Sequence, residues 1–259
     1  MSVPCTACGH SVTTRDPFFY RWEGGEHWIR RCSSCTHQFV DPPVTPAQQD
    51  RIYADHYFAR DGDWAVDHFD GKSYQDAEAE LVAEARDVLP WLAGYRGRLL
   101  DVGCAGGTFL AEAHTVGFDV HGLEINAAMA ESARERYGLD VTCSSIEAAG
   151  ELGRFDVVTM MDVLEHVPAP LEALRKVHGW LRPGGVLFVR GPLVTGVLPR
   201  VKESVRRIIG REKQLPGYPL DANMFNRRSL TACMVAAGMP PVRWEQAPGF
   251  VQVVGRRGI

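Results

Sequence analysis

The stretch LLDVGCAGGTFL at residues 99–110 constrains the fold of this chain more than any other. A short apolar run leads into a series of small residues, and a helical pattern of apolar side chains begins at Phe109. This order predicts a buried parallel strand, a tight turn and the start of a helix. Small residues at such a turn allow a ligand to lie against bare backbone, and the helix N-terminus offers unpaired N–H groups. We therefore expect a nucleotide-like ligand at this turn.

The residues around the turn narrow the choice of ligand. Dinucleotide-binding enzymes use the pattern G-x-G-x-x-G, which from Gly103 requires glycines where this sequence has Ala105 and Thr108. Asp101, at the strand end, would repel a pyrophosphate and suits an ammonium or sulfonium cation. About twenty residues further on, the run DVHGLE at 119–124 ends in Glu124, where a strand-end carboxylate can accept both hydroxyls of a ribose. A ribose with a cationic tail describes S-adenosylmethionine.

Four segments, in this order, resemble the class I S-adenosylmethionine-dependent methyltransferases of the small-molecule type: LLDVGCAGGTFL, VHGLEIN, FDVVTMMDVLEHV and LRPGGVLFV. The resemblance covers roughly residues 95–192 and implies methyl transfer by in-line displacement. It implies a cofactor site formed by Asp101, Gly103, Ala105, Gly107, Glu124, Ile125, Ser145, Ile146, Met160 and Met161. Ala105 stands where many members of the family have glycine, a change that removes no functional group.

Strand and helix patterns alternate along the C-terminal part of the chain. Strands are predicted at 98–102, 119–124, 139–143, 155–161 and 186–190, and helices at 108–116, 127–137 and 169–181. We predict a Rossmann-like, doubly wound α/β fold with a mostly parallel seven-stranded sheet and helices on both faces. A hairpin at 241–254 closes the sheet. The predicted domains are a zinc ribbon at 1–44, a helical cap or linker at 45–95 and a methyltransferase domain at 96–259 with a lid insertion at about 192–223.

Four of the seven cysteines form two C-x-x-C pairs, Cys5 with Cys8 and Cys32 with Cys35. Two such pairs present four thiolates to one tetrahedral Zn²⁺, and the aromatic, β-prone segment between them is typical of a zinc-ribbon hairpin. We therefore predict a structural zinc, with a disulfide framework and a ribbon without metal as the alternatives. His10 and His37 are spare candidate ligands.

Composition limits the partners of the chain. The formal net charge of −4 and the pI near 6.1 give no general attraction to nucleic acid or to anionic membranes. No apolar run is long enough to span a bilayer, and residues 1–20 contain no signal-peptide pattern, so we expect a cytoplasmic protein, monomeric or homodimeric. The leading hypothesis is methylation of a small molecule such as a sugar or natural product. Methylation of ribosomal or transfer RNA guided by the ribbon, and a regulatory protein without turnover, are the alternatives.

The segment Asp162-Val163-Leu164-Glu165-His166 concentrates polar side chains after the fourth predicted strand. His166 or Asp162 is a candidate to remove a proton from the acceptor. Resemblance to a few metal-binding members of the fold suggests a divalent cation held by Asp162, Glu165 and His166, whereas in most relatives Glu165 and His166 orient the following helix. Tyr57, like Tyr53, is a candidate to close over the site.

The insertion before the last helix contains a basic amphipathic pattern over residues 200–213. We expect its apolar face to cover the site, with its charges either solvated or recognising an anionic acceptor. Relatives often carry a histidine before the aromatic residue of the segment that follows. This chain has Asp221 and Asn223 in that neighbourhood.

Overall fold

The computed structural model describes residues 3–52, 77–194, 212–215, 219–247 and 250–259. The chain forms two compact units. Unit 1 comprises Met1–Val44, Asp162–His178 and Val189–Arg256, and unit 2 comprises Thr45–Met161, Gly179–Phe188 and Arg257–Ile259. The predicted domain boundaries at residues 44 and 95 stay predictions. Tyr53, Tyr57 and the basic pattern at 200–211 lie outside the described residues.

The described residues form a seven-stranded sheet with the strand order β11-β12-β8-β7-β4-β5-β6. Its strands are β4 (Arg98–Val102), β5 (Asp119–Glu124), β6 (Val141–Cys143), β7 (Phe155–Met161), β8 (Leu181–Pro192), β11 (Pro241–Ala247) and β12 (Phe250–Arg256). β4 pairs in parallel with both β5 and β7, β5 pairs in parallel with β6, and β11 with β12 is antiparallel. The predicted mostly parallel, Rossmann-like sheet is confirmed.

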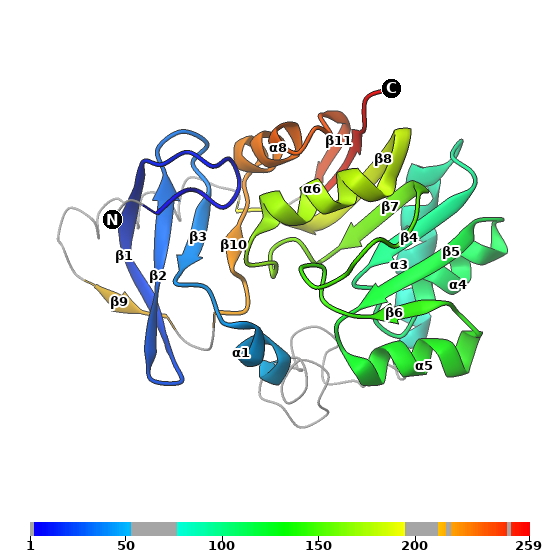
Figure 1. The fold of residues 1–259 in the computed structure, drawn as a ribbon, viewed down its shortest axis with the longest axis horizontal. Coiled ribbons are helices and arrows are strands. Elements are labelled where there is room, and N and C mark those ends of the chain that lie inside the picture. Colours follow the sequence, from blue (N-terminus) through cyan, green and yellow to red (C-terminus); the bar gives the residue numbers. More distant parts are fainter. Residues whose placement is uncertain (1–2, 53–76, 195–211, 216–218, 248–249) are drawn as a thin grey trace. The chain divides into compact units, whose positions relative to one another are not determined.

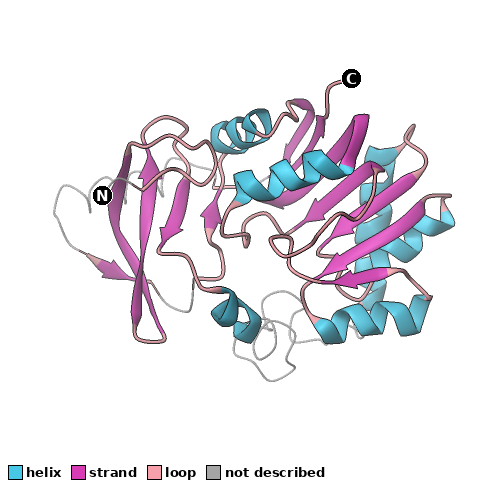
Figure 2. Ribbon diagram, in the orientation of Figure 1, coloured by secondary structure: helices cyan, strands magenta, loops and turns pink. Residues whose placement is uncertain are grey.

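The centre of the sheet is buried and mostly apolar. Leu99, Leu100, Val157 and Val158 have no exposed surface. Among the described residues, the helices of unit 2 are α1 (Pro46–Arg51), α3 (Glu78–Val88), the short 3₁₀ helix η2 (Leu89–Leu92), α4 (Thr108–Thr115) and α5 (Ala127–Tyr137). Figure 2 shows α3, α4 and α5 beside the strands β4, β5 and β6 of the same unit.

Local sequence explains where these helices begin and end. The side chain of Asn126 accepts a hydrogen bond from the Met129 amide at the start of α5, and Gly138 ends the helix with a φ of 65°. In unit 1, Asn226 and Ser229 form a capping box at the start of α8 (Arg227–Ala236). The third helix of the predicted alternation corresponds to α6 (Pro170–Trp180), which matches the predicted range 169–181 to within a residue at each end.

β8 is longer than the predicted strand at 186–190. Its first residues include Pro183-Gly184-Gly185, which would ordinarily indicate a turn. Backbone hydrogen bonds from Gly184 to Arg257 and from Arg257 to Gly185 continue the ladder through this segment. The C-terminal residues therefore extend the strand.

Unit 1 contains a second sheet, which the sequence predicts only in part. The predicted ribbon hairpin consists of β1 (Thr13–Trp22) and β2 (Gly25–Cys32), and β3 (Gln38–Asp41) adds to it. Two short strands from the insertion complete this sheet: β9 (Lys213–Gln214) pairs with β1, and β10 (Asn223–Met224) pairs with β3. Figure 1 shows β9 and β10 at the two edges of the ribbon strands. The segment predicted only as a lid thus also supplies both edge strands.

Candidate functional site

The turn after β4 has the backbone that its small residues allow. Gly103, Ala105 and Gly107 have φ values of 77°, 46° and 84°, in the left-handed region that favours glycine. The amides of Gly103 and Cys104 donate to the Leu123 carbonyl at the end of β5. The tight strand-turn-helix predicted from residues 99–110 is therefore present, with its ends held by the neighbouring strand.

Asp101 is a buried carboxylate at the end of β4. It is 2% exposed, and its Oδ1 accepts a hydrogen bond of 2.6 Å from the hydroxyl of Thr159 on β7. Burial raises the pKa of Asp101 to about 7; the Thr159 hydroxyl acts in the opposite direction, and the nearby Glu124 charge adds to the rise. A buried carboxylate with a raised pKa is stabilised in its charged form by a cationic ligand, so this residue fits an ammonium or sulfonium group.

Glu124 lies at the end of the adjacent strand β5, and its carboxylate is fixed by two backbone amides. The amide of Asn126 donates to Oε1 at 2.7 Å, and the amide of Ala105 donates to Oε2 at 2.9 Å. Burial raises the pKa of Glu124, while these amides oppose the rise. Each oxygen of a carboxylate has two lone pairs, so both retain the capacity to accept a ribose hydroxyl.

The remaining residues predicted to bind the cofactor lie around the same strand ends. Ile125 follows β5 and is partly exposed, while Ile146 follows β6 and is buried. The hydroxyl of Ser145 accepts a hydrogen bond from the Ala148 amide and so shapes this turn. Met160 is fully buried, whereas Met161, the last residue of β7, keeps part of its surface exposed.

A second polar group lies within unit 1. The Nδ1 atom of buried His166 is 3.2 Å from Oδ1 of Asp221 and 3.4 Å from the Leu220 carbonyl. Burial lowers the pKa of His166, but the hydrogen bond with Asp221 and the charge of Glu165 outweigh it and raise the pKa. Burial raises the pKa of Glu165 to about 7. The charge of His166 acts against this rise, and the charges of Asp162 and Asp221 add to it. The contact between His166 and Asp221 and the raised pKa values of His166 and Glu165 suit a general acid or base.

Two neighbours of this polar group come from different parts of the sequence. Asp162 has a φ of 53°, which is strained backbone for a residue with a side chain, and its amide donates to the Arg190 carbonyl. Tyr20 lies on β1 of the ribbon, where burial and the charge of Asp221 raise its pKa. The ribbon thus contributes a hydroxyl near Asp221.

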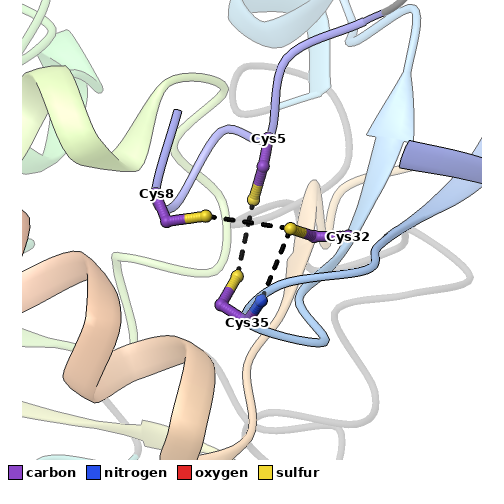
Figure 3. Close-up of side chains that lie close together, drawn as sticks. All are labelled: Cys5, Cys8, Cys32 and Cys35. Carbon is purple, nitrogen blue, oxygen red and sulfur yellow. Dashed lines mark hydrogen bonds between the residues drawn. The ribbon is translucent and has the colours of Figure 1, made fainter. Parts of the chain in front are cut away.

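The four cysteines predicted to bind zinc point toward one another (Figure 3). Their sulfur atoms all lie within 4.8 Å of one another, with Cys5 and Cys35 at 3.6 Å and Cys8 and Cys32 at 3.7 Å. A tetrahedral zinc with Zn–S bonds of about 2.3 Å places its sulfurs about 3.8 Å apart. The cluster therefore has the dimensions of a zinc site. Among the residues that the structure describes, no other group of three or more histidine, cysteine or acidic side chains gathers in this way, so Asp162, Glu165 and His166 do not form one.

The two cysteine pairs have the same backbone conformation. The Cys5 amide donates to the His10 carbonyl and the Gly9 amide to the Cys5 carbonyl; the Cys32 amide donates to the His37 carbonyl and the Thr36 amide to the Cys32 carbonyl. Gly9 and Thr36 hold equivalent positions, with φ values of 72° and 63°. The tight backbone of the second pair is therefore at Thr36, just after Cys35.

Several residues of these groups are not found by the sequence motifs. Asp221 and Asn223 lie in the neighbourhood where the family resemblance leads us to expect a histidine, and this departure is the one sequence signal at the position. Tyr20 belongs to an aromatic run whose pattern indicates the core of the ribbon and not a functional residue. Thr159 lies within an apolar strand, and only the parallel register of β4 and β7 brings it to Asp101. Side-chain partners on neighbouring strands require the strand order as well as the sequence.

The sequence matches a family described as "Methyltransferase domain" over residues 74–242. It is 31% identical over 137 residues to a ubiquinone biosynthesis O-methyltransferase of Shewanella sp. (strain ANA-3), covering 50% of this chain and 56% of that protein. It is 37% identical over 99 residues to the protein of the same name from Parvibaculum lavamentivorans, covering 36% and 39%. The matches thus span about half or less of these relatives.

Among solved structures, the fold is similar to that of a magnesium protoporphyrin IX methyltransferase from Synechocystis PCC 6803 with bound SAH. The TM-score is 0.58 at 18% identity, and the match covers 82% of this chain and 99% of that one. At this identity the likeness concerns the fold alone. No helix within the described ranges has the length and apolar character needed to cross a membrane.

Proposed function

Since the chain belongs to the methyltransferase-domain family, we propose that it transfers a methyl group from S-adenosylmethionine to a small-molecule acceptor. The family resemblance predicted from the sequence is confirmed by this match. The observation that carries the proposal is the pair of buried carboxylates, Asp101 and Glu124, at the ends of adjacent parallel strands on either side of the glycine-rich turn.

Each carboxylate has a distinct role in binding the cofactor. Glu124, fixed by the Ala105 and Asn126 amides, accepts hydrogen bonds from the ribose hydroxyls. Asp101 faces the cationic end, where a positive charge offsets the cost of its burial. Gly103 and Gly107 allow close approach of the backbone. Ser145, Ile146 and Ile125 border the adenine, and we assign Met161 rather than the fully buried Met160 to the methionine end.

When bound, S-adenosylmethionine supplies an electrophilic methyl group on its sulfonium. We propose that the acceptor atom is a hydroxyl oxygen, as the O-methyltransferase names of the two relatives suggest. A hydroxyl loses its proton as the new carbon–oxygen bond forms, and His166 is the proton acceptor in this proposal. Asp221, in contact with Nδ1 of His166, stabilises the resulting imidazolium, and Glu165 adds negative charge nearby.

The acceptor is a small molecule, such as a sugar or another natural product. The ribbon supports this choice because it places Tyr20 near Asp221, which suits a role in shaping the acceptor group. Its charged residues do not form the basic surface that nucleic acid requires: Arg15, Arg21 and Arg30 are ion-paired with Glu212, Glu26 and Asp41.

We also propose that Cys5, Cys8, Cys32 and Cys35 bind one structural Zn²⁺, as their sulfur spacing supports. The hydrogen bond from Cys35 lowers the pKa of Cys5 to about 5, toward the thiolate form that binds metal. Elemental analysis is expected to find one zinc per chain in the wild type and much less in Cys8→Ser. The control Cys143→Ser, at an exposed cysteine outside the cluster, keeps its zinc.

The experiment that tests the function uses methyl-labelled S-adenosylmethionine with purified protein and a cell extract, with the label separated into small-molecule, protein and nucleic-acid fractions. Label is expected in the small-molecule fraction for the wild type and to be lost in His166→Gln, although this variant still binds the cofactor. Label in RNA contradicts the proposed acceptor class. Absence of cofactor binding by the wild type contradicts methyl transfer itself.

A further inference from the structure

Asn223 is a buried amide that contacts two segments far from it in the sequence. It is 2% exposed and begins β10 in unit 1. Its Nδ2 donates to the carbonyls of Val167 at 2.6 Å and Glu165 at 3.4 Å, and its own amide donates to the Glu165 carbonyl at 2.9 Å. On its other side, Oδ1 accepts from the Thr6 hydroxyl at 3.1 Å and lies 3.0 Å from Nε2 of His37.

These contacts use the full hydrogen-bonding capacity of the side chain. An asparagine amide has two N–H donors and an oxygen with two lone pairs. Both donors here point at the Glu165–Val167 segment, and both lone pairs point at donors from the ribbon. Only one orientation of the side-chain amide therefore satisfies every partner. In the flipped amide, the NH₂ group would face the donors of the ribbon and the oxygen would face the carbonyls of Glu165 and Val167. A buried amide satisfied in this way holds its neighbours in a fixed arrangement.

The ribbon partners of Asn223 are parts of the two cysteine pairs. Thr6 lies between Cys5 and Cys8, and its carbonyl accepts a hydrogen bond from the Leu171 amide. His37 follows Cys35 by two residues, and its carbonyl accepts the Cys32 amide. Since a tetrahedral metal fixes all four cysteines, it also fixes the Thr6 hydroxyl and the His37 ring against Asn223.

The other partners of Asn223 surround His166 in the sequence. The carbonyls of Glu165 and Val167 are the two that flank it, so their hydrogen bonds determine the course of the backbone from which the His166 ring projects. Asp221, the partner of that ring, lies two residues before Asn223. One side chain thus orders both the segment that carries the histidine and the segment that carries its carboxylate.

We propose that Asn223 is a positioning residue that couples metal binding at the four cysteines to the placement of His166 against Asp221. The proposal rests on the proposed function for the roles of the zinc and of His166. With zinc bound, the ribbon holds Asn223 and the His166–Asp221 contact is maintained. Without zinc, the cysteine pairs separate, Thr6 and His37 withdraw from Asn223, and His166 loses its fixed partner.

The test follows the His166 ring directly by NMR, with its signal assigned by its disappearance in His166→Gln. In the zinc-loaded wild type the pKa of His166 is expected above the ordinary value of about 6.5, and to fall toward it when a chelator removes the zinc. In zinc-loaded Asn223→Ala the pKa is expected to be lowered already and to respond no further to the chelator. The kcat is expected to fall by up to about a hundredfold, while the Kd for S-adenosylmethionine stays unchanged.

Asn226→Ala is the matched control. Asn226 also donates to the ribbon, at the Thr36 carbonyl, but the hydrogen bonds of its side chain within the described residues go to Thr36 and Ser229 and to neither Glu165 nor Val167. It is expected to leave the His166 pKa and its response to the chelator as in the wild type, despite the loss of the α8 cap. If Asn226→Ala shifts His166 as much as Asn223→Ala does, the effect is general loosening and the proposal is wrong.

A second variant covers the case in which Asn223→Ala does not fold. Thr6→Val removes only the hydroxyl on the ribbon side and preserves the shape of the side chain. A smaller shift of the His166 pKa in the same direction is expected, and an unchanged pKa in either folded variant refutes the coupling. Cofactor binding and label transfer are measured separately, so a protein that binds no S-adenosylmethionine contradicts the proposed function while the NMR result still decides the coupling.

Discussion

Replacing Glu124 by glutamine tests the cofactor site with the smallest change of shape. The carboxylate accepts one backbone amide on each oxygen, at 2.7 Å and 2.9 Å. In the variant, one oxygen becomes an NH₂ group. If the remaining oxygen faces Asn126, the NH₂ group faces the Ala105 amide, and two donors oppose each other at the turn.

The expected magnitude follows from these contacts. A hydrogen bond to a charged acceptor contributes about 1.5 to 3 kcal/mol, and the variant loses the charged acceptor that we assign to the ribose hydroxyls. Because 1.4 kcal/mol corresponds to a tenfold change in Kd, the Kd for S-adenosylmethionine is expected to rise roughly 10- to 150-fold. The stability of the protein without cofactor changes less, because loss of the hydrogen bond with Ala105 is offset by removal of a buried charge whose pKa is already raised.

The assay is isothermal titration calorimetry with S-adenosylmethionine, together with urea unfolding in the absence of cofactor. Glu131→Gln is the control, since Glu131 lies on the exposed face of α5 in an ion pair with Arg134. Its Kd is expected to equal that of the wild type. A folded Glu124→Gln variant whose Kd stays within about threefold of the wild type would refute the ribose assignment.

Three further substitutions test the same turn. Asp101→Asn is expected to raise the melting temperature of the cofactor-free protein at pH 8 but not at pH 4. Because the pKa of Asp101 is about 7 in the folded protein and about 4 in the unfolded chain, the wild type loses up to about 4 kcal/mol of stability as the pH rises from about 4 to 7. Asparagine carries no charge and removes this loss. Ala105→Gly is expected to stabilise the protein by up to about 1 kcal/mol in urea unfolding, because glycine relieves the φ of 46°, and to leave the cofactor Kd unchanged since the amide to Glu124 is kept. Gly107→Ala is expected to cost about 2 kcal/mol or more in the same assay, since a Cβ there would lie 2.6 Å from Cδ1 of Leu139 and 2.9 Å from Cβ of Ala133; an unchanged unfolding midpoint would contradict it.

The sequence predicts the central fold well because the signals there are local. β4 and β7 are mostly apolar runs, β5 follows the glycine-rich turn at the expected spacing, and the observed bounds of all three strands are those predicted. β9 and β10 have only two residues each and carry no periodic pattern. They exist because the ribbon strands beside them offer free edges, and pairing of this kind depends on contacts that are remote in the sequence.

The candidate functional residues likewise differ in how well the sequence predicts them. Asp101 and Glu124 are recognisable because the residue type, the strand end and the turn all lie within one short stretch. Asp221 and Asn223 are not, because their partners lie more than fifty positions earlier: 56 residues separate Asn223 from Val167. The sequence offers only the absence of the histidine that the family resemblance leads us to expect there, whereas the structure shows Asp221 beside His166 and Asn223 bonded to the Val167 carbonyl.

The contacts of the ribbon indicate what a metal site contributes in this chain. A ribbon that served only as an appendage would need its metal for its own folding and would share few hydrogen bonds with other segments. Here its sheet is completed by β9 and β10, and the side chains of Thr6 and His37 both bond to Asn223. In the proposed arrangement, fixing the cysteines therefore also fixes two partners of Asn223. The same arrangement explains why a segment predicted as a lid contains two strands that belong to the ribbon: the insertion and the ribbon form one sheet, and the proposed proton acceptor is held by hydrogen bonds from its edge.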